Sequence, residues 1–234
     1  MNLNTKTINN KFLIGVLIII PLFIIFVIII CRHVIVPTDE DIIDNLKNMK
    51  CYTSSVEYEF KNEKLDYKEN TKQYYDTEKG IRVEFNDEGD RIKVYKGGEI
   101  KVQDNNDEYS LDKDMDIIYP LAFLDNIFSN SDAKEIQEIK PDWSDEVYLK
   151  VDIDYNYKNK HLSNAEFYVN KNTGDPVLLK IYDVNKKERI TIKYNEFKEE
   201  KQLNDELFWY NIGSFFLKRK ETLELKYHER SKWW

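Results

Sequence analysis

Residues able to do acid–base, nucleophilic or metal chemistry are few and scattered along this chain. Its three histidines, His33, His161 and His228, lie far apart in the sequence. An enzyme needs a nucleophile, a base or a metal cluster held together, and these histidines form no recognisable set. We therefore expect no catalytic residues, no metal site and no cofactor.

Closely spaced aspartates are the remaining candidates for chemistry. Asp152 alternates with Asp154, and Asp112, Asp114 and Asp116 do the same in an earlier segment. Carboxylates spaced in this way project from one face of a strand, where they could bind calcium or serve as a hydrolase pair. The glycine and the terminal bidentate glutamate of a calcium loop are missing at the expected spacing. We interpret these acids as solvated strand and turn faces.

The distribution of charge argues against a nucleic-acid partner. The formal net charge is −8, and the acids concentrate in the body of the chain, whereas the first 37 residues and the tail from Gly213 are basic. A phosphate-binding face needs clustered Lys and Arg, but here the lysines are interleaved with more numerous acids. The two cysteines, Cys31 and Cys51, do not suggest a disulfide scaffold.

The strongest single signal is the apolar run of residues 12–30. It contains no charge and is about long enough to span a bilayer. Lys6 and Lys11 precede it and favour a cytoplasmic N-terminus, so we predict that residues 1–37 form a cytoplasmic end and a membrane anchor, with the remainder outside the cytoplasm at the cell or spore inner membrane. The alternatives are lipid attachment at Cys31 and conventional cleavage. Ile30 before the cysteine and the absence of a small-x-small site disfavour them.

The body begins with a predicted helix and continues as strands. Thr38 is placed to cap a helix with Asp41 three residues later, and an apolar face follows. From Cys51 the apolar period changes to two, as in a half-buried strand. The pair Gly97-Gly98 predicts the clearest hairpin, since a two-residue turn requires positive φ. Strands are expected near residues 51–60, 64–77, 81–85, 92–96, 99–102, 107–111, 147–155, 165–169, 177–182 and 190–197.

The stretch of residues 119–129 interrupts the strands and is strongly apolar. Leu121, Leu124 and Phe128 are spaced by three and four, which predicts a helix. So large an apolar segment must be buried in a sheet, a partner or a ligand site. We predict that it plugs the concave face of the sheet or lines a ligand site there, using Tyr119, Leu121, Phe123, Leu124, Ile127 and Phe128.

The order of these elements predicts a mainly β (α+β) fold, with a single curved antiparallel sheet and helices on one face. Residues 130–144 are polar and contain Pro141, so a short helix or loop is expected there. The folded domain should span residues 38–208. The basic, aromatic tail of residues 209–234 is able to rest on an anionic membrane surface, or to form an edge strand or a loose end.

Three blocks of the sequence carry a family resemblance. They are DIIDNLKNMKCY at residues 41–52, IYPLAFLDNIF at 118–128, and NTGDPVLLKIYD at 172–183, which leads into ITIKYNEF at 190–197 and closes at 207–208. In this order they resemble the germination lipoprotein GerS and its relatives in anaerobic spore-formers, a group similar in fold to the LolA and LppX lipoprotein carriers. The resemblance implies a half-barrel sheet with helices across its concave face.

The same resemblance implies a non-enzymatic role in spore germination, with a cortex-modifying amidase of the CwlD type as protein partner. Our leading hypothesis is therefore a membrane-tethered extracytoplasmic binding protein that docks such an enzyme. The alternative is a lipid or lipoprotein receptor that uses the concave face of the sheet. A hydrolase that uses Asp152 and Asp154 is a third, weaker hypothesis.

Overall fold

The computed structural model describes residues 10–35, 37–61, 66–86, 91–105, 107–129, 131–155 and 159–208, with the backbone alone for residues 10–16, 31–35 and 131–134. The chain divides into two compact units, Met1–Ile42 and Ile43–Trp234. Each unit is described by itself. The tail of residues 209–234 lies outside the described residues.

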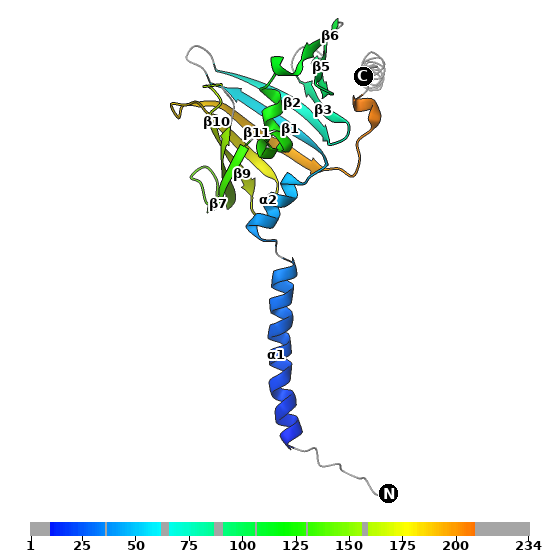
Figure 1. Cartoon of the computed structure of the whole chain (residues 1–234). Coiled ribbons are helices and arrows are strands. Elements are labelled where there is room, and N and C mark those ends of the chain that lie inside the picture. The colour runs from blue at the N-terminus through cyan, green and yellow to red at the C-terminus, as the bar shows by residue number, and fades with distance from the viewer. Residues whose placement is uncertain are drawn as a thin grey trace, which may run out of the picture. The chain divides into compact units, whose positions relative to one another are not determined.

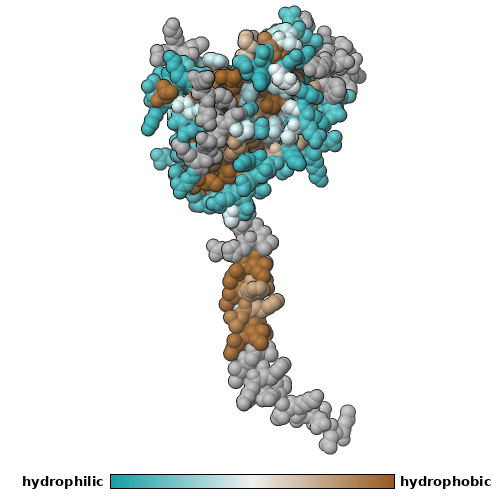
Figure 2. Space-filling model, in the orientation of Figure 1, coloured by the Kyte–Doolittle hydropathy of each residue, from teal (hydrophilic) through white to brown (hydrophobic). Residues whose placement is uncertain are grey.

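The first unit contains one long helix, α1 (Asn10–Ile35), with Pro21 in its interior. Its large apolar side chains from Leu17 to Ile30 are 40–70% exposed, and they form the hydrophobic band on the helix in Figure 2. Among the residues that the structure describes, no helix is found that is long and apolar enough to cross a membrane. The predicted span of residues 12–30 is therefore not confirmed.

The short helix α2 (Asp39–Lys47) begins where the sequence predicts it. The Thr38 amide donates a hydrogen bond to Oδ2 of Asp41 at 2.9 Å, and the Asp41 amide donates to Oγ1 of Thr38 at 3.1 Å. This reciprocal pair satisfies amides that a helix start leaves unpaired, and it holds the pKa of Asp41 below its usual value. Ile43 and Leu46 are buried, as the predicted apolar face requires.

The second unit is built on one eleven-stranded antiparallel sheet, in the order β6-β5-β4-β3-β2-β1-β11-β10-β9-β8-β7. Strands β1 to β6 form one meander and β7 to β11 form another, and the two meanders join through the pair β1 and β11. The mainly β, antiparallel fold predicted from the sequence is thus confirmed. The strands are β1 (Cys51–Phe60), β2 (Tyr67–Asp76), β3 (Gly80–Phe85), β4 (Arg91–Lys96), β5 (Glu99–Asp104), β6 (Asp107–Asp112), β7 (Ser131–Ile139), β8 (Tyr148–Tyr155), β9 (Asn164–Asn170), β10 (Pro176–Tyr182) and β11 (Glu188–Glu199).

The predicted hairpin at Gly97-Gly98 joins β4 to β5. Both glycines have positive φ, 62° and 87°, and the flanking residues Lys96 and Glu99 face each other in the ladder. Positive φ at both central residues is what a two-residue type I′ turn requires. The turn therefore explains both glycines.

An insert of residues 113–129 leads from the edge strand β6 to the opposite edge strand β7. It contains the 3₁₀-helices η1 (Lys113–Met115) and η2 (Tyr119–Ala122) and the short helix α3 (Leu124–Ser129). Figure 1 shows the sheet curving around this insert, which lies across one face. We call the covered face the inner face and the opposite one the outer face.

Two predictions for this region need correction. The helix predicted over residues 119–129 is broken at Phe123, which is extended (φ −84°, ψ 135°), because its amide bonds to the Pro120 carbonyl and closes a 3₁₀ turn. The short helix or loop predicted for residues 130–144 is wrong over its first part. There the chain forms the edge strand β7, since pairing with β8 from Ser131 to Ile139 satisfies its backbone.

The segment after β11 packs on the outer face near β1, β2 and β3. It ends in the 3₁₀-helix η3 (Asp205–Phe208). Phe208 and Leu203 form an apolar cluster with Cys51 and Tyr74. The side chain of Lys79 donates a hydrogen bond to the Leu203 carbonyl at 2.7 Å. This part of the outer face is therefore covered by the chain itself.

Candidate functional site

The insert places its apolar side chains against the inner face of the sheet. Leu121, Phe123, Leu124 and Ile127 are at most 2% exposed, and Phe128 is 9% exposed. Burial of an apolar side chain of this size contributes about 1.5–3 kcal/mol relative to exposure. The structure thus brings together five of the six residues singled out from the sequence, and the sixth, Tyr119, is half-buried beside them.

Aromatic side chains of the sheet receive two residues of the insert. The ring of Phe123 lies 6.4 Å from that of Tyr52 on β1 and 6.2 Å from that of Tyr75 on β2. The ring of Phe128 meets Phe167 on β9 edge-on, at 5.8 Å. Offset and edge-on pairs of this kind add about 0.5–1.5 kcal/mol beyond burial. The insert therefore contacts both meanders.

Three tyrosine hydroxyls of the inner face hold the backbone of the insert. Burial raises the pKa of each of these tyrosines well above its usual value, so that they stay neutral and can donate and accept hydrogen bonds. The bonds join the Tyr58 hydroxyl to the Tyr119 carbonyl (2.7 Å), the Tyr194 hydroxyl to the Ala122 carbonyl (2.5 Å), and the Leu124 amide to the Tyr52 hydroxyl (3.0 Å).

A buried ion pair fixes the start of the insert to β4. The ammonium of Lys93 lies 2.5 Å from Oδ2 of Asp116, and the Tyr95 hydroxyl donates to the same oxygen at 2.9 Å. The side chains of Lys93 and Asp116 are only 13% and 8% exposed. Burial and the neighbouring Asp116 carboxylate raise the pKa of Tyr95. We call Lys93, Tyr95 and Asp116 the polar latch.

A second polar group lies beside this latch. The Glu69 carboxylate pairs with the Arg91 guanidinium and accepts a hydrogen bond from the Tyr119 hydroxyl. Arg91 also lies over the ring of Phe85, at 3.9 Å from its centre. Burial, together with the hydrogen bond to Glu69, raises the pKa of Tyr119. These groups pair with one another, so the arrangement positions the insert on the sheet.

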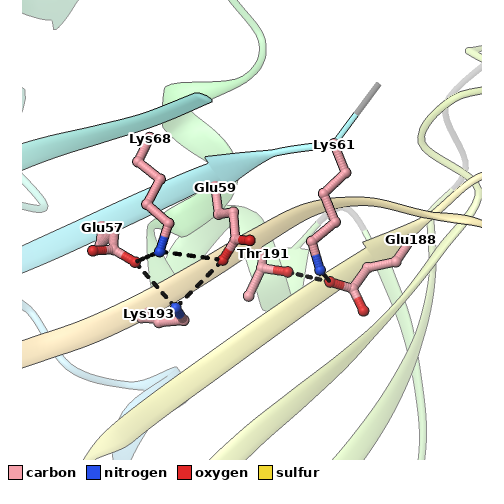
Figure 3. A network of polar contacts seen from close by, with 7 residues as sticks. All are labelled: Glu57, Glu59, Lys61, Lys68, Glu188, Thr191 and Lys193. Atoms are coloured by element: carbon pink, nitrogen blue, oxygen red, sulfur yellow. Dashed lines mark hydrogen bonds and ion pairs between the residues drawn. The ribbon is translucent and has the colours of Figure 1, made fainter. Parts of the chain in front are cut away.

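The outer face carries a network of charged side chains over β1, β2 and β11 (Figure 3). Lys193 lies 3.0 Å from Glu57 and 3.4 Å from Glu59, and Lys68 bridges the same two glutamates at 3.1 and 3.7 Å. Such residues come together because Glu57 and Lys193 are paired across the β1 and β11 ladder. Hydrogen bonds from Lys193 and Lys68 lower the pKa of Glu57.

This network predicts a loss of stability in acid. A carboxylate whose pKa is lowered in the folded protein stabilises it above the unfolded pKa, and that contribution is lost as pH falls through the folded pKa. Lys193→Met should raise the pKa of Glu57 towards 4.5 and weaken the decline in the free energy of unfolding between pH 5 and pH 3. The check is the Glu57 titration by carbon NMR with denaturation at both pH values. Lys198→Met, at a 72% exposed position of the same strand, is the control, and an unchanged Glu57 pKa in Lys193→Met would contradict the assignment.

The acids considered for metal chemistry do not gather. Asp116 belongs to the polar latch, Asp112 caps η1 by accepting from the Asp114 amide at 3.3 Å, and Asp152 pairs with Lys150 at 3.0 Å. Within the described residues, no group of three or more His, Cys, Asp and Glu is placed to hold a metal ion. Side chains of His33, Cys31 and His228 lie outside the described part. Lipid attachment at Cys31 therefore stays an untested alternative to the retained helix.

Comparison of the sequence with known protein families identifies the family to which the chain belongs. Residues 11–208 match the family described as Sporulation protein YdcC-like, which is most of the chain. The chain belongs to the YdcC-like sporulation family. This membership agrees with the resemblance to germination proteins at the level of sporulation, whereas the GerS-specific assignment stays a prediction. No curated protein matches the sequence significantly.

Solved structures with a similar arrangement are distant from this YdcC-like chain. An uncharacterized conserved protein from Thermus thermophilus is 15% identical, with 74% of this chain and 94% of that one covered and a TM-score of 0.49. The LolA superfamily protein NE2245 from Nitrosomonas europaea is 11% identical, with 75% and 99% covered and a TM-score of 0.46. A chain from the complex of the CwlD amidase with the GerS lipoprotein of Clostridioides difficile is 20% identical, with 70% and 97% covered and a TM-score of 0.42. With every one of these TM-scores below 0.5, the family assignment rests on the sequence match.

Proposed function

We propose that this YdcC-like protein is a non-enzymatic binding protein that acts outside the cytoplasm in sporulation or germination by docking a protein partner. The observation that carries the proposal is the burial of the insert. Leu121, Phe123 and Ile127 occupy the inner face, where a carrier would need an open apolar cavity. Because the chain's own side chains occupy that face, we propose that the partner protein binds the outer surface.

The proposed partner is a cortex-modifying amidase of the CwlD type. Support comes from the sporulation family and from the order of the three sequence blocks that resemble GerS relatives. The proposed tether is a retained membrane helix over residues 12–30, supported by its uncharged sequence and by the exposed apolar side chains of α1. Mass spectrometry of the mature chain tests the tether, because lipidation at Cys31 or cleavage would change its mass.

The partner is tested with the purified full chain in detergent and a purified amidase of this type. Biolayer interferometry and co-elution in size-exclusion chromatography should both detect a complex. Deletion of the gene should also produce a germination defect. Failure to bind any cortex enzyme, together with normal germination of the deletion strain, would overturn the proposal.

The lipid-receptor alternative predicts a different result from the same preparation. If the inner face held acyl chains, organic extraction of the protein from native membranes would return a lipid in constant stoichiometry. Because the insert fills the inner face, we expect no lipid in constant stoichiometry. Any loosely bound lipid should be removed when the detergent is exchanged. Phe123→Ala is the matched variant, because a cavity opened beneath the insert should acquire lipid or detergent if the face favours acyl chains.

A further inference from the structure

A pocket of about 460 Å³ opens on the outer face, beside the charged network of Figure 3. Volumes of this size are typical of ligand sites. The ladder explains how the sequence builds it, because Lys180 on β10 faces Thr191 on β11, and Thr191 faces Glu59 on β1. The pocket is lined by Glu59, Lys61, Trp143, Val177, Leu178, Lys180, Glu188, Thr191, Lys193, Tyr194 and Asn195.

One wall of this pocket is apolar and fixed in place. Trp143, in the turn between β7 and β8, lies 4.8 Å from the ring of Tyr148 and meets the ring of Tyr168 edge-on at 6.1 Å. Tyr148 and Tyr168 belong to a buried cluster with Leu178. Trp143 nevertheless remains 49% exposed. A tryptophan held by its neighbours and left half open is the residue type that most often dominates binding energy at protein interfaces.

The opposite wall is charged, and most of its groups are already satisfied. Lys61 pairs with Glu188 at 2.5 Å, and Thr191 donates to the same carboxylate. Lys193 is engaged by the glutamates of β1. The side chain of Lys180, by contrast, makes no hydrogen bond or ion pair with a residue that the structure describes. It acts on Glu188 only through its charge, which adds to the hydrogen bonds from Lys61 and Thr191 in lowering the pKa of that carboxyl.

The charge balance of the pocket differs from that of the whole chain. Three lysines and two glutamates line it, although the formal net charge of the protein is −8. With Lys180 unpaired among the described residues, the pocket favours an occupant that brings a carboxylate. The Lys61–Glu188 and Lys193–Glu59 pairs join the other charged groups of the pocket to one another, so the excess positive charge of its lining is that of Lys180. An apolar group therefore fits the Trp143 wall, and a single anionic group fits Lys180.

We propose that this pocket receives a segment of the partner protein that presents an apolar or aromatic side chain next to a carboxylate. The apolar side chain packs against Trp143, Val177 and Leu178, and the carboxylate pairs with Lys180. This inference rests on the proposed docking function and adds to it the surface used and the chemistry recognised.

The test uses the full chain in detergent and two probes. The first is the purified amidase, and the second is a random twelve-residue peptide library displayed on phage. Trp143→Ala should weaken binding of the amidase, or of a selected peptide, at least about tenfold. Lys180→Glu should weaken it severalfold and reduce its salt dependence, whereas Lys180→Arg should retain it. Val184→Ala, at a 58% exposed position beyond β10, is the control.

The two probes separate this inference from the proposed function. Selected peptides rich in aromatic or aliphatic residues beside Asp or Glu would support the proposed role of the pocket. They would do so even if the amidase failed to bind and was therefore rejected as the partner. If Trp143→Ala changed the affinity for the amidase by less than twofold, the proposed role of the pocket would be overturned, although the docking function would stand. Selection of no peptide at Trp143, or stronger binding of soluble cortex oligosaccharides there, would also overturn it. Trp143→Ala and Lys180→Glu should both keep the wild-type thermal midpoint, which shows that a loss of binding does not come from unfolding.

Discussion

Replacing Phe123 with alanine is expected to lower the free energy of unfolding of the sheet domain by about 3–5 kcal/mol, the range for loss of a buried phenylalanine. Phe123 is fully buried, and its ring lies against those of Tyr52 and Tyr75. Its removal leaves a cavity between the insert and the inner face. The extended backbone at Phe123 holds this side chain in place, so the neighbouring turns cannot close the cavity without breaking their own hydrogen bonds.

Urea unfolding of the full chain, followed by far-ultraviolet circular dichroism, measures this effect. Met115→Ala is the matched control, because Met115 lies in the same insert but is 71% exposed. It should change the free energy of unfolding by no more than about 0.5 kcal/mol. Equal effects of the two substitutions would show that the insert does not pack on the sheet as described.

The second large effect is expected from Asp116→Ala in the polar latch. This change leaves the Lys93 ammonium buried without its carboxylate and removes the acceptor of the Tyr95 hydroxyl. Removal of one partner of a buried ion pair typically costs about 3–5 kcal/mol. The start of the insert should consequently loosen, with faster hydrogen exchange in η2 than in the wild type.

A double substitution separates the ion pair from general disruption. Lys93→Met combined with Asp116→Leu removes both charges and should recover most of the stability lost in Asp116→Ala, since an apolar pair can replace a buried ion pair. Asp114→Ala is the control, as Asp114 is a nearby exposed acid of the same insert. If the double variant were as unstable as the single one, the loss would come from packing and not from an unpaired charge.

Local patterns in the sequence were sufficient for much of the fold. Alternating residues in β1 and β11 and the Gly97-Gly98 turn predicted strands and a hairpin that the structure contains. The edge strand β7 could not be predicted in this way. Its sequence, SDAKEIQEI, lacks clean alternation, and its register against β8 shifts between Ala133 and Ile136. Pairing with β8, and not local propensity, decides its conformation.

The inner face was foreseen only in part for a similar reason. The apolar residues of the insert are adjacent in sequence, so their burial could be predicted. The polar latch joins Lys93 to Asp116, and Glu69 meets Tyr119 from fifty residues away. The position of Trp143 in the wall of the pocket could not be predicted either, because a single tryptophan in a polar turn belongs to no periodic pattern of apolar residues. Such groups meet only after the sheet has formed, and a scan for local spacing cannot find them.

The single junction between the two meanders also governs when this domain is able to fold. β1 and β11 pair across a separation of about 140 residues, as in Ser55 with Glu196. Contacts so distant along the chain close slowly, because the entropy of a long loop must be overcome first. Until β11 has been made, the edge of β1 that faces away from β2 has no strand to pair with, and Tyr194 is not there to bind the insert. The two meanders can consequently close into one sheet only after the last strand has been made.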